Sequence, residues 1–155
     1  MSKAGGIVEV IARGVCVVRG HLLLCQNKRA ANSYLPGGHV EFRECAAEAL
    51  AREIREEMGR DARVGSFLGC CEHTFRQRGR RHAEINLVFA MTISGLCAEE
   101  PPEACEDWIT FRWCPIRALA RSALEPAPMR KLVPHWLKRP GFASAGEGWL
   151  PPHGR

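Results

Sequence analysis

The chain has 155 residues, of which 46% are hydrophobic and 25% are charged. These values are typical of a single globular domain, and they exclude a disordered or fibrous chain. The formal net charge of +5, from 22 basic and 17 acidic residues, permits an anionic ligand but is too small to indicate a nucleic-acid-binding protein by itself.

No apolar run approaches the ~20 residues that a membrane-spanning helix needs, and the first nine residues lack the pattern of a signal peptide. The eight cysteines include no C-x-x-C pair, so their spacing favours neither a zinc site nor a thioredoxin-like motif. We interpret most of them as small buried hydrophobic residues. We therefore expect a cytoplasmic protein that does not enter a membrane.

In chain order, the first half predicts a hairpin, a shaped loop and a helix. Residues 7–18 are rich in Val and Ile, and together with residues 21–25 they predict the two strands of a β-hairpin. Residues 34–38, Tyr-Leu-Pro-Gly-Gly, predict a shaped loop, because Pro stiffens the chain and Gly permits unusual backbone angles. Apolar residues recur at spacings of three and four over residues 45–58, which predicts a helix that Gly59 ends.

The second half predicts three strands and two further helical segments. The strands are expected at residues 64–73, 83–93 and 108–113, with a polar hairpin tip at 76–81. Apolar residues from Ile116 to Leu124 suit an amphipathic helix, and residues 129–137 suit a shorter element that Pro134 interrupts.

These elements predict a mixed α/β fold in which one mixed sheet is flanked by helices. We expect residues 1–140 to form a single domain. Residues 141–155 are rich in Gly, Ala, Ser and Pro, so they predict a poorly ordered tail.

The residues with the clearest chemistry are the carboxylates of the first helix. Glu53 and Glu57 lie one turn apart, at the border of its buried face. Like charges at this spacing cost ~0.2–0.5 kcal/mol per pair, so a cation should offset them. A hard divalent ion such as Mg²⁺ takes oxygen ligands and suits such a site. For Arg52 and Glu56, an ordinary ion pair on a solvated helix face is an equally good interpretation.

The spacing of the motif then points to a known family. Gly38 is followed after five residues by Glu44, and after seven more by Arg-Glu-Ile-Arg-Glu-Glu-Met-Gly at positions 52–59. This segment resembles the Nudix box, G-x5-E-x7-R-E-U-x-E-E-x-G-U, in which U is apolar. Only the last position departs from the pattern, because it is Arg60.

The resemblance to Nudix hydrolases of the MutT-like kind, with no subfamily assigned, implies an α/β/α sandwich with a loop–helix–loop metal site. By position in the motif, the ligands of Mg²⁺ or Mn²⁺ would be Glu53, Glu56, Glu57 and the Gly38 carbonyl. The same resemblance implies that Glu44 and Arg52 orient the site. Family members often take a further carboxylate from a loop in the region of Glu106, which is our candidate for that role.

Three other features are candidates for substrate binding. Arg78 and Arg80 belong to an arginine-rich hairpin tip whose guanidinium groups suit phosphate oxygens. Glu84 is a charged residue beside an apolar run, where charge is unusual without a ligand or solvent. Tyr34 could stack on a base.

The resemblance implies metal-dependent hydrolysis of a pyrophosphate bond in a nucleoside diphosphate linked to another moiety, and we favour ADP-ribose or a nucleotide sugar. The first alternative is a house-cleaning pyrophosphatase that acts on (deoxy)nucleoside triphosphates. An alternative of another class is a non-catalytic regulatory domain that binds nucleotides. We expect a nucleotide-derived small molecule as the partner, no specific nucleic acid, and allow for a homodimer.

Overall fold

The structure is a computed structural model that describes residues 6–139, so the predicted tail at 141–155 lies outside the described residues. Its elements are, in chain order, β1 (Ile7–Val15), β2 (Val17–Val18), β3 (His21–Asn27), β4 (Ser33–Tyr34), β5 (Gly37–His39), α1 (Ala46–Met58), β6 (Ala62–Gln77), β7 (Arg80–Ile93), β8 (Ile109–Pro115), the 3₁₀ helix η1 (Ile116–Arg121) and α2 (Met129–Leu137).

The strands form two four-stranded sheets. The first has the order β5-β1-β7-β6 and is mixed, because β1 and β7 run parallel while the other two pairs are antiparallel. The second contains β2, β3, β4 and β8, and all its pairs are antiparallel. The predicted mixed α/β fold is confirmed, although its strands are divided between two sheets rather than gathered in one.

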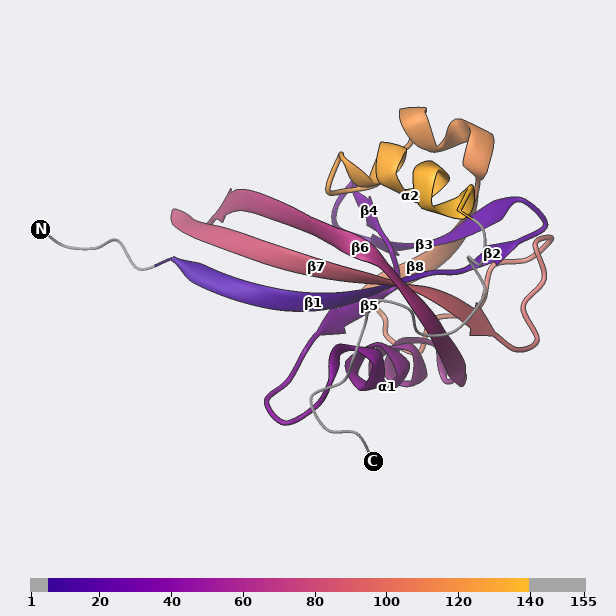
Figure 1. The fold of residues 1–155 in the computed structure, drawn as a ribbon, viewed down its shortest axis with the longest axis horizontal. Coiled ribbons are helices and arrows are strands. Elements are labelled where there is room, and N and C mark those ends of the chain that lie inside the picture. Colours follow the sequence, from indigo (N-terminus) through magenta and orange to yellow (C-terminus); the bar gives the residue numbers. More distant parts are fainter. Residues whose placement is uncertain (1–5, 140–155) are drawn as a thin grey trace, which may run out of the picture.

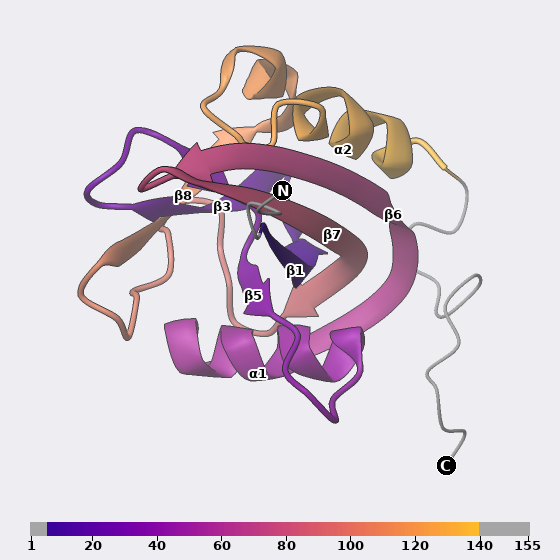
Figure 2. The ribbon, with the colours of Figure 1, turned by 90° about the vertical axis from the view of Figure 1, so that its left-hand side faces the viewer.

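Helices cover the sheets on opposite sides (Figures 1 and 2). α1 packs on a core cluster that includes Leu23, Leu50 and Phe89. η1 and α2 pack on a second cluster that includes Leu22 and Trp136. The neighbouring β3 residues Leu22 and Leu23 thus face different clusters, as the alternation of side chains along a strand requires.

The predicted hairpin of residues 7–18 and 21–25 is only partly correct. The long first strand is broken at Cys16, whose carbonyl accepts a hydrogen bond from the Leu23 N–H at 2.9 Å. Of the two resulting strands, β2 pairs with β3, whereas β1 pairs with β5 and β7 in the other sheet. The chain therefore passes from one sheet to the other at Cys16.

The helices also differ in part from the predictions. α1 begins one residue after the predicted start, and Gly59 ends it in a left-handed conformation (φ 65°). The segment 116–124 forms only the six-residue η1, since Ser33 bonds to the carbonyl of Ala123 and bridges to Leu124. Conversely, α2 continues through Pro134, and its apolar face is buried on the second core cluster.

β6 and β7 form a hairpin that extends, together with β1, as an arm from the body of the molecule (Figure 1). Its turn consists only of Arg78 and Gly79, which have positive φ angles of 49° and 76°. Such angles are typical of the two-residue turns that suit the twist of β-hairpins. The predicted tip at 76–81 was too wide, because Arg76 pairs with Arg81 and Gln77 with Arg80.

All eight cysteines lie among the described residues, and all are free thiols. The interpretation of most as buried was too broad, because only four of the eight are buried, namely Cys16, Cys25, Cys71 and Cys114. Within residues 6–139, no helix is long and apolar enough to cross a membrane.

Candidate active site

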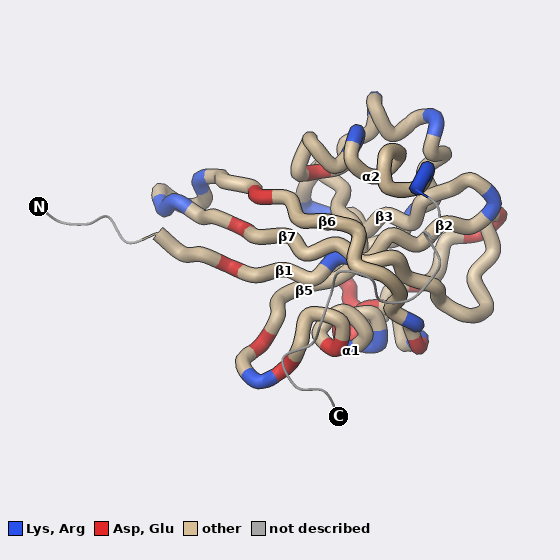
Figure 3. Tube along the Cα trace, viewed as in Figure 1, with Lys and Arg blue, Asp and Glu red and all other residues tan. Residues whose placement is uncertain are grey.

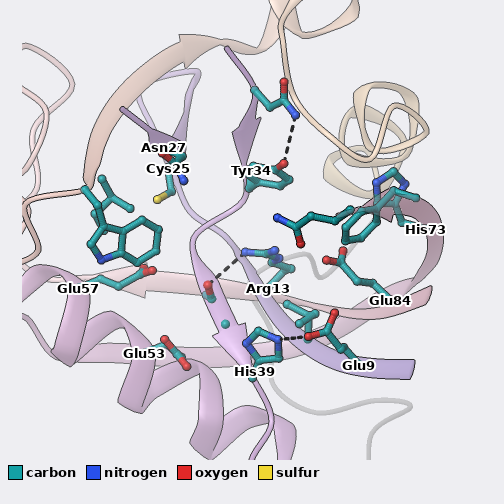
Figure 4. Close-up of a pocket in the computed structure, with 18 of the residues that line it drawn as sticks. Glu9, Arg13, Cys25, Asn27, Tyr34, His39, Glu53, Glu57, His73 and Glu84 are labelled. Carbon is teal, nitrogen blue, oxygen red and sulfur yellow. Dashed lines mark hydrogen bonds and ion pairs between the residues drawn. The ribbon is translucent and has the colours of Figure 1, made fainter. Parts of the chain in front are cut away.

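A cavity of about 660 Å³ lies where β1, β5, α1, the β6–β7 hairpin and the segment before β8 meet (Figure 4). Its lining is mostly polar and charged. The residues that line this cavity include Glu9, Arg13, Tyr34, Gly38, Glu53, Glu57, Glu84 and Glu106.

Two glycines allow α1 to approach β5 at one end of the cavity. A side chain at Gly38 would collide with the carboxyl group of Glu53. A side chain at Gly37, where φ is 130°, would collide with the carbonyl oxygen of Ala12. Gly38 therefore leaves room for the Glu53 side chain of α1, so its backbone lies beside that carboxylate, whereas Gly37 leaves room for the backbone of the neighbouring strand β1.

Arg52 organises the carboxylates of α1. Its guanidinium donates two hydrogen bonds to Glu44, at 2.7 and 3.0 Å, and one each to Glu53 and Glu56 at 3.1 Å. A fifth bond, of 3.0 Å, goes to the carbonyl of His39 on β5. Because Arg52 bonds to α1 and to β5, it fixes the orientation of Glu53 relative to the strand that contains Gly38.

Glu57 is the most unusual group in the site. It is only 6% exposed, and its Oε2 atom is buried without a hydrogen-bond partner. Burial, and then the charges of Glu53 and Glu106, raise the pKa of this carboxyl to about 8, while Arg13 and the Gly37 N–H act in the opposite direction. A further cation bound beside this buried carboxyl would lower its pKa and stabilise its charged form.

Glu106 approaches Glu57 although the two are far apart in the sequence. The Cys105 N–H donates a 2.7 Å hydrogen bond to the Glu57 carbonyl, which fastens the segment before β8 to the last turn of α1. Glu106 Oε2 is also buried without a hydrogen-bond partner. We call Glu53, Glu57 and Glu106 the carboxylate cluster.

The carboxylate cluster has the chemistry that a hard divalent ion requires, namely oxygen donors with unsatisfied buried atoms. Glu56 differs, because it does not line the cavity and its half-exposed side chain bonds to Arg52. No three acidic, His or Cys side chains within residues 6–139 already converge as ligands of one ion. Two effects keep these carboxylates apart. Their negative charges repel one another, and the ion pair with Arg52 holds Glu53.

Arg13 lies in the middle of the cavity and was not singled out from the sequence (Figure 4). Its guanidinium donates hydrogen bonds to the carbonyls of Leu35 and Gly37, at 3.0 and 3.1 Å, and to Asn86 at 3.3 Å. Burial lowers the pKa of Arg13, and the charges of Glu84 and Glu57 counteract this effect. Because an arginine stays charged in proteins, Arg13 supplies a fixed positive charge between these two carboxylates.

A sequence model of the NUDIX domain matches residues 8–136. The chain belongs to the Nudix family. Nudix hydrolases generally use divalent metal ions, and the family acts on nucleotide-derived diphosphates.

Two curated relatives match parts of the chain. A Mycobacterium tuberculosis protein that carries the mutator-protein name MutT4 is 34% identical over 100 residues, which cover 64% of this chain and 38% of the relative. The ADP-ribose pyrophosphatase of Methanocaldococcus jannaschii is 41% identical over 61 residues, which cover 39% of this chain and 35% of the relative. The matched segments thus span little more than a third of either relative.

A solved structure supports the same family. The MutT NUDIX hydrolase of Burkholderia pseudomallei is 25% identical, with a TM-score of 0.57. The similarity covers 72% of this chain and 85% of that protein.

Outside the Nudix box, the predicted substrate-binding residues lie at different places. Tyr34 and Glu84 line the cavity, and the Arg13 guanidinium lies 5.5 Å from the centre of the Tyr34 ring. Arg78 and Arg80 do not line it, since they lie at the end of the β6–β7 arm among other basic residues (Figure 3). Arg76 from the same hairpin does line the cavity.

Sequence reasoning missed several cavity residues that the Nudix box does not include. Glu9 and Arg13 lie on β1, and His73 lies on β6. A signal was present on β1, because Glu9, Ile11 and Arg13 alternate along a strand and must share one face. Charged residues at two of these three positions mark a face that is not purely core.

Proposed function

We propose that this chain is a divalent-metal-dependent pyrophosphohydrolase whose substrate is a nucleoside diphosphate linked to another moiety, with ADP-ribose or a nucleotide sugar preferred. The observation that carries the proposal is the carboxylate cluster at one end of a cavity that continues past Arg13 to a polar wall. Such a cavity offers separate places for a pyrophosphate and for the groups attached to it. The likeness to an ADP-ribose pyrophosphatase supports this substrate class.

The residues that would hold Mg²⁺ or Mn²⁺ are Glu53, Glu57 and Glu106, with the Gly38 carbonyl beside them and Glu56 at the outer edge. When bound, such an ion offsets charge on the pyrophosphate and lowers the pKa of a bound water. Arg52 and Glu44 keep Glu53 in place through the hydrogen bonds described above.

Arg13 contributes a different part of the mechanism. Its guanidinium is fixed by three hydrogen bonds, two of them to the backbone carbonyls of Leu35 and Gly37. A fixed cation beside the metal-binding end attracts the phosphates without needing to reorganise when substrate arrives. Tyr34, whose ring centre lies 5.5 Å from the same guanidinium, would contact the group next to the phosphates.

A second candidate function has its own support. This candidate is the pyrophosphatase of (deoxy)nucleoside triphosphates that we expected as the first alternative for a MutT-like chain, and two similar proteins carry the MutT name. This alternative uses the same carboxylate cluster and differs in what the rest of the cavity binds.

A substrate panel tests the proposal. ADP-ribose, nucleotide sugars and (deoxy)nucleoside triphosphates are incubated with the protein and Mg²⁺ or Mn²⁺, and the products are identified by chromatography. The proposal expects a nucleoside monophosphate and a phosphorylated sugar. Pyrophosphate release from triphosphates would favour the second candidate, and binding without hydrolysis would favour a regulatory nucleotide-binding domain.

The cytoplasmic location belongs to the same proposal, and the eight free thiols support it, because thiols stay reduced in that compartment.

A further inference from the structure

The cavity has a second group of residues at the end away from the carboxylate cluster. We call Glu9, His39, His73, Phe75 and Glu84 the distal wall; all five line the cavity. Figure 4 shows Glu9, Glu84 and His73 on the far side of Arg13 from Glu53 and Glu57. The strand pairing explains the grouping, since Glu84 on β7 lies opposite both Glu9 on β1 and His73 on β6.

Within the distal wall, the two carboxylates have different surroundings. Glu9 lies 2.8 Å from His39 Nε2 and 3.5 Å from His82 Nδ1. Glu84 Oε2, in contrast, is buried and has no hydrogen-bond partner. A buried acceptor without a donor is costly, and a functional role or a bound group that supplies the donor accounts for such an acceptor.

The surroundings of Glu84 are held in place. The rings of His73 and Phe75 stack with their centres 5.3 Å apart, and those of Phe75 and His82 with theirs 5.1 Å apart. His82 also lies within ion-pair distance of Glu9. The wall is therefore an ordered surface, which is what selective hydrogen bonding requires.

We propose that Glu84 determines specificity by accepting hydrogen bonds from a neutral, donor-bearing part of the substrate. This inference rests on the proposed function. Glu9 and Glu84 would repel phosphates. The pyrophosphate is therefore expected between Arg13 and the carboxylate cluster, and an uncharged group at the distal wall. A sugar diol and the N–H edge of a base both present adjacent donors that fit a carboxylate.

The test measures binding to ligands that cannot be hydrolysed, by calorimetry with Mg²⁺ present. One pair is the α,β-methylene analogue of ADP-ribose and the same analogue with a 2,3-dideoxy terminal ribose. The other pair is α,β-methylene GDP and α,β-methylene IDP, which differ in one amino group. The first pair detects recognition of the sugar, and the second detects recognition of the base.

Wild-type protein is expected to bind the donor-bearing member of one pair about 10-fold more tightly, since a hydrogen bond to a charged group has this effect. Glu84→Gln and Glu84→Ala should reduce this preference to about twofold or less. Both variants should bind the donor-poor member no more weakly than wild type, because the removed charge repels phosphate. Thermal melting confirms that they fold.

Glu72→Gln is the matched control, because Glu72 is an exposed carboxylate on β6 that does not line the cavity. It should keep the wild-type preference. The inference would be overturned if wild type showed no preference in either ligand pair. It would also be overturned if the Glu84 variants kept the wild-type preference, or if they lost affinity equally for the donor-bearing and the donor-poor ligand. Since no turnover is measured, donor-dependent binding by a chain that fails the substrate panel would contradict the hydrolysis and not the role of Glu84.

Discussion

At the residue scale, the most connected side chain of the candidate site is Arg52, which bonds to Glu44, Glu53 and Glu56. Arg52→Ala leaves these carboxylates without their shared cation. We expect activity to fall at least ~10-fold and the free energy of unfolding to fall by about 1–2 kcal/mol, as is common when bonds to a charged group are lost.

The control for this change is Arg55→Ala on the same helix. Arg55 pairs with Asp61, and both side chains are mostly exposed, so the loss should stay within about 0.5 kcal/mol. Steady-state kinetics and urea unfolding measure both effects. Equal behaviour of the two variants would show that Arg52 does not organise the site.

The raised pKa of Glu57 predicts that the stability of the metal-free protein depends on pH. This pKa is raised from 4.5 to about 8 in the folded chain, mainly by burial. The unfolded carboxyl loses its proton near pH 4.5, whereas the folded one keeps it until near pH 8. The stability is therefore fully present below pH 4.5 and is lost progressively as the pH rises to about 8.

Glu57→Gln removes this titration while keeping the size of the side chain. In chelator, the variant should melt at least 2–4 °C above wild type at pH 8, which corresponds to a gain of at least ~1 kcal/mol in a chain of this size, and the difference should vanish near pH 4.5. Added Mg²⁺ should stabilise wild type and not the variant. Glu56→Gln, at a half-exposed position, should show no such pH-dependent gain; a pH-independent difference for Glu57→Gln would contradict the assignment.

At the element scale, the junction between β5 and α1 depends on close contact. Gly38→Ala should displace the Glu53 carboxyl, because the added methyl group would collide with it. We expect kcat to fall at least ~10-fold while the helix content by circular dichroism stays unchanged. Gly65→Ala is a suitable control, since its methyl group would meet its nearest neighbour at an ordinary 3.4 Å; the same kcat for both variants would refute this role of Gly38.

The β6–β7 hairpin carries arginines at different distances from the cavity. Arg76 lines it, whereas Arg78 lies in the exposed turn. Arg76→Gln should raise KM several-fold with little change in kcat, because ground-state and transition-state attraction fall together. Arg78→Gln should raise KM less, and only at low salt, where exposed charges act over longer distances; a larger effect at Arg78 would reverse the assignment.

The elements also show where sequence reasoning succeeds. α1 and its glycine stop were predictable because apolar spacing and a C-terminal glycine act within a few residues. The division of residues 7–18 at Cys16 was not, since it depends on pairing with β7, more than 70 residues later. The same applies to η1, whose length is limited by the bonds of the following residues to Ser33.

At the scale of the whole molecule, the site is assembled from distant parts of the chain. Glu53 and Glu57 could be placed on one side of α1 from the motif, because fixed spacing on one helix fixes their relative positions, whereas Glu56 of the same motif does not line the cavity. Arg13 and Glu9 could not be placed in this way, since the parallel pairing of β1 with β7 brings them to the cavity. Glu106 was named from the family resemblance, and its position beside Glu57 depends on the bond from Cys105.

The most direct test of the central claim measures AMP release from ADP-ribose by wild type and by Glu57→Gln, with Mg²⁺ and with excess chelator. Wild type should release AMP only with the metal. The variant should be at least ~100-fold slower in kcat, which corresponds to ~2.7 kcal/mol in the barrier. Undiminished AMP release by the variant, or by wild type in chelator, would contradict a metal-dependent site built on the carboxylate cluster.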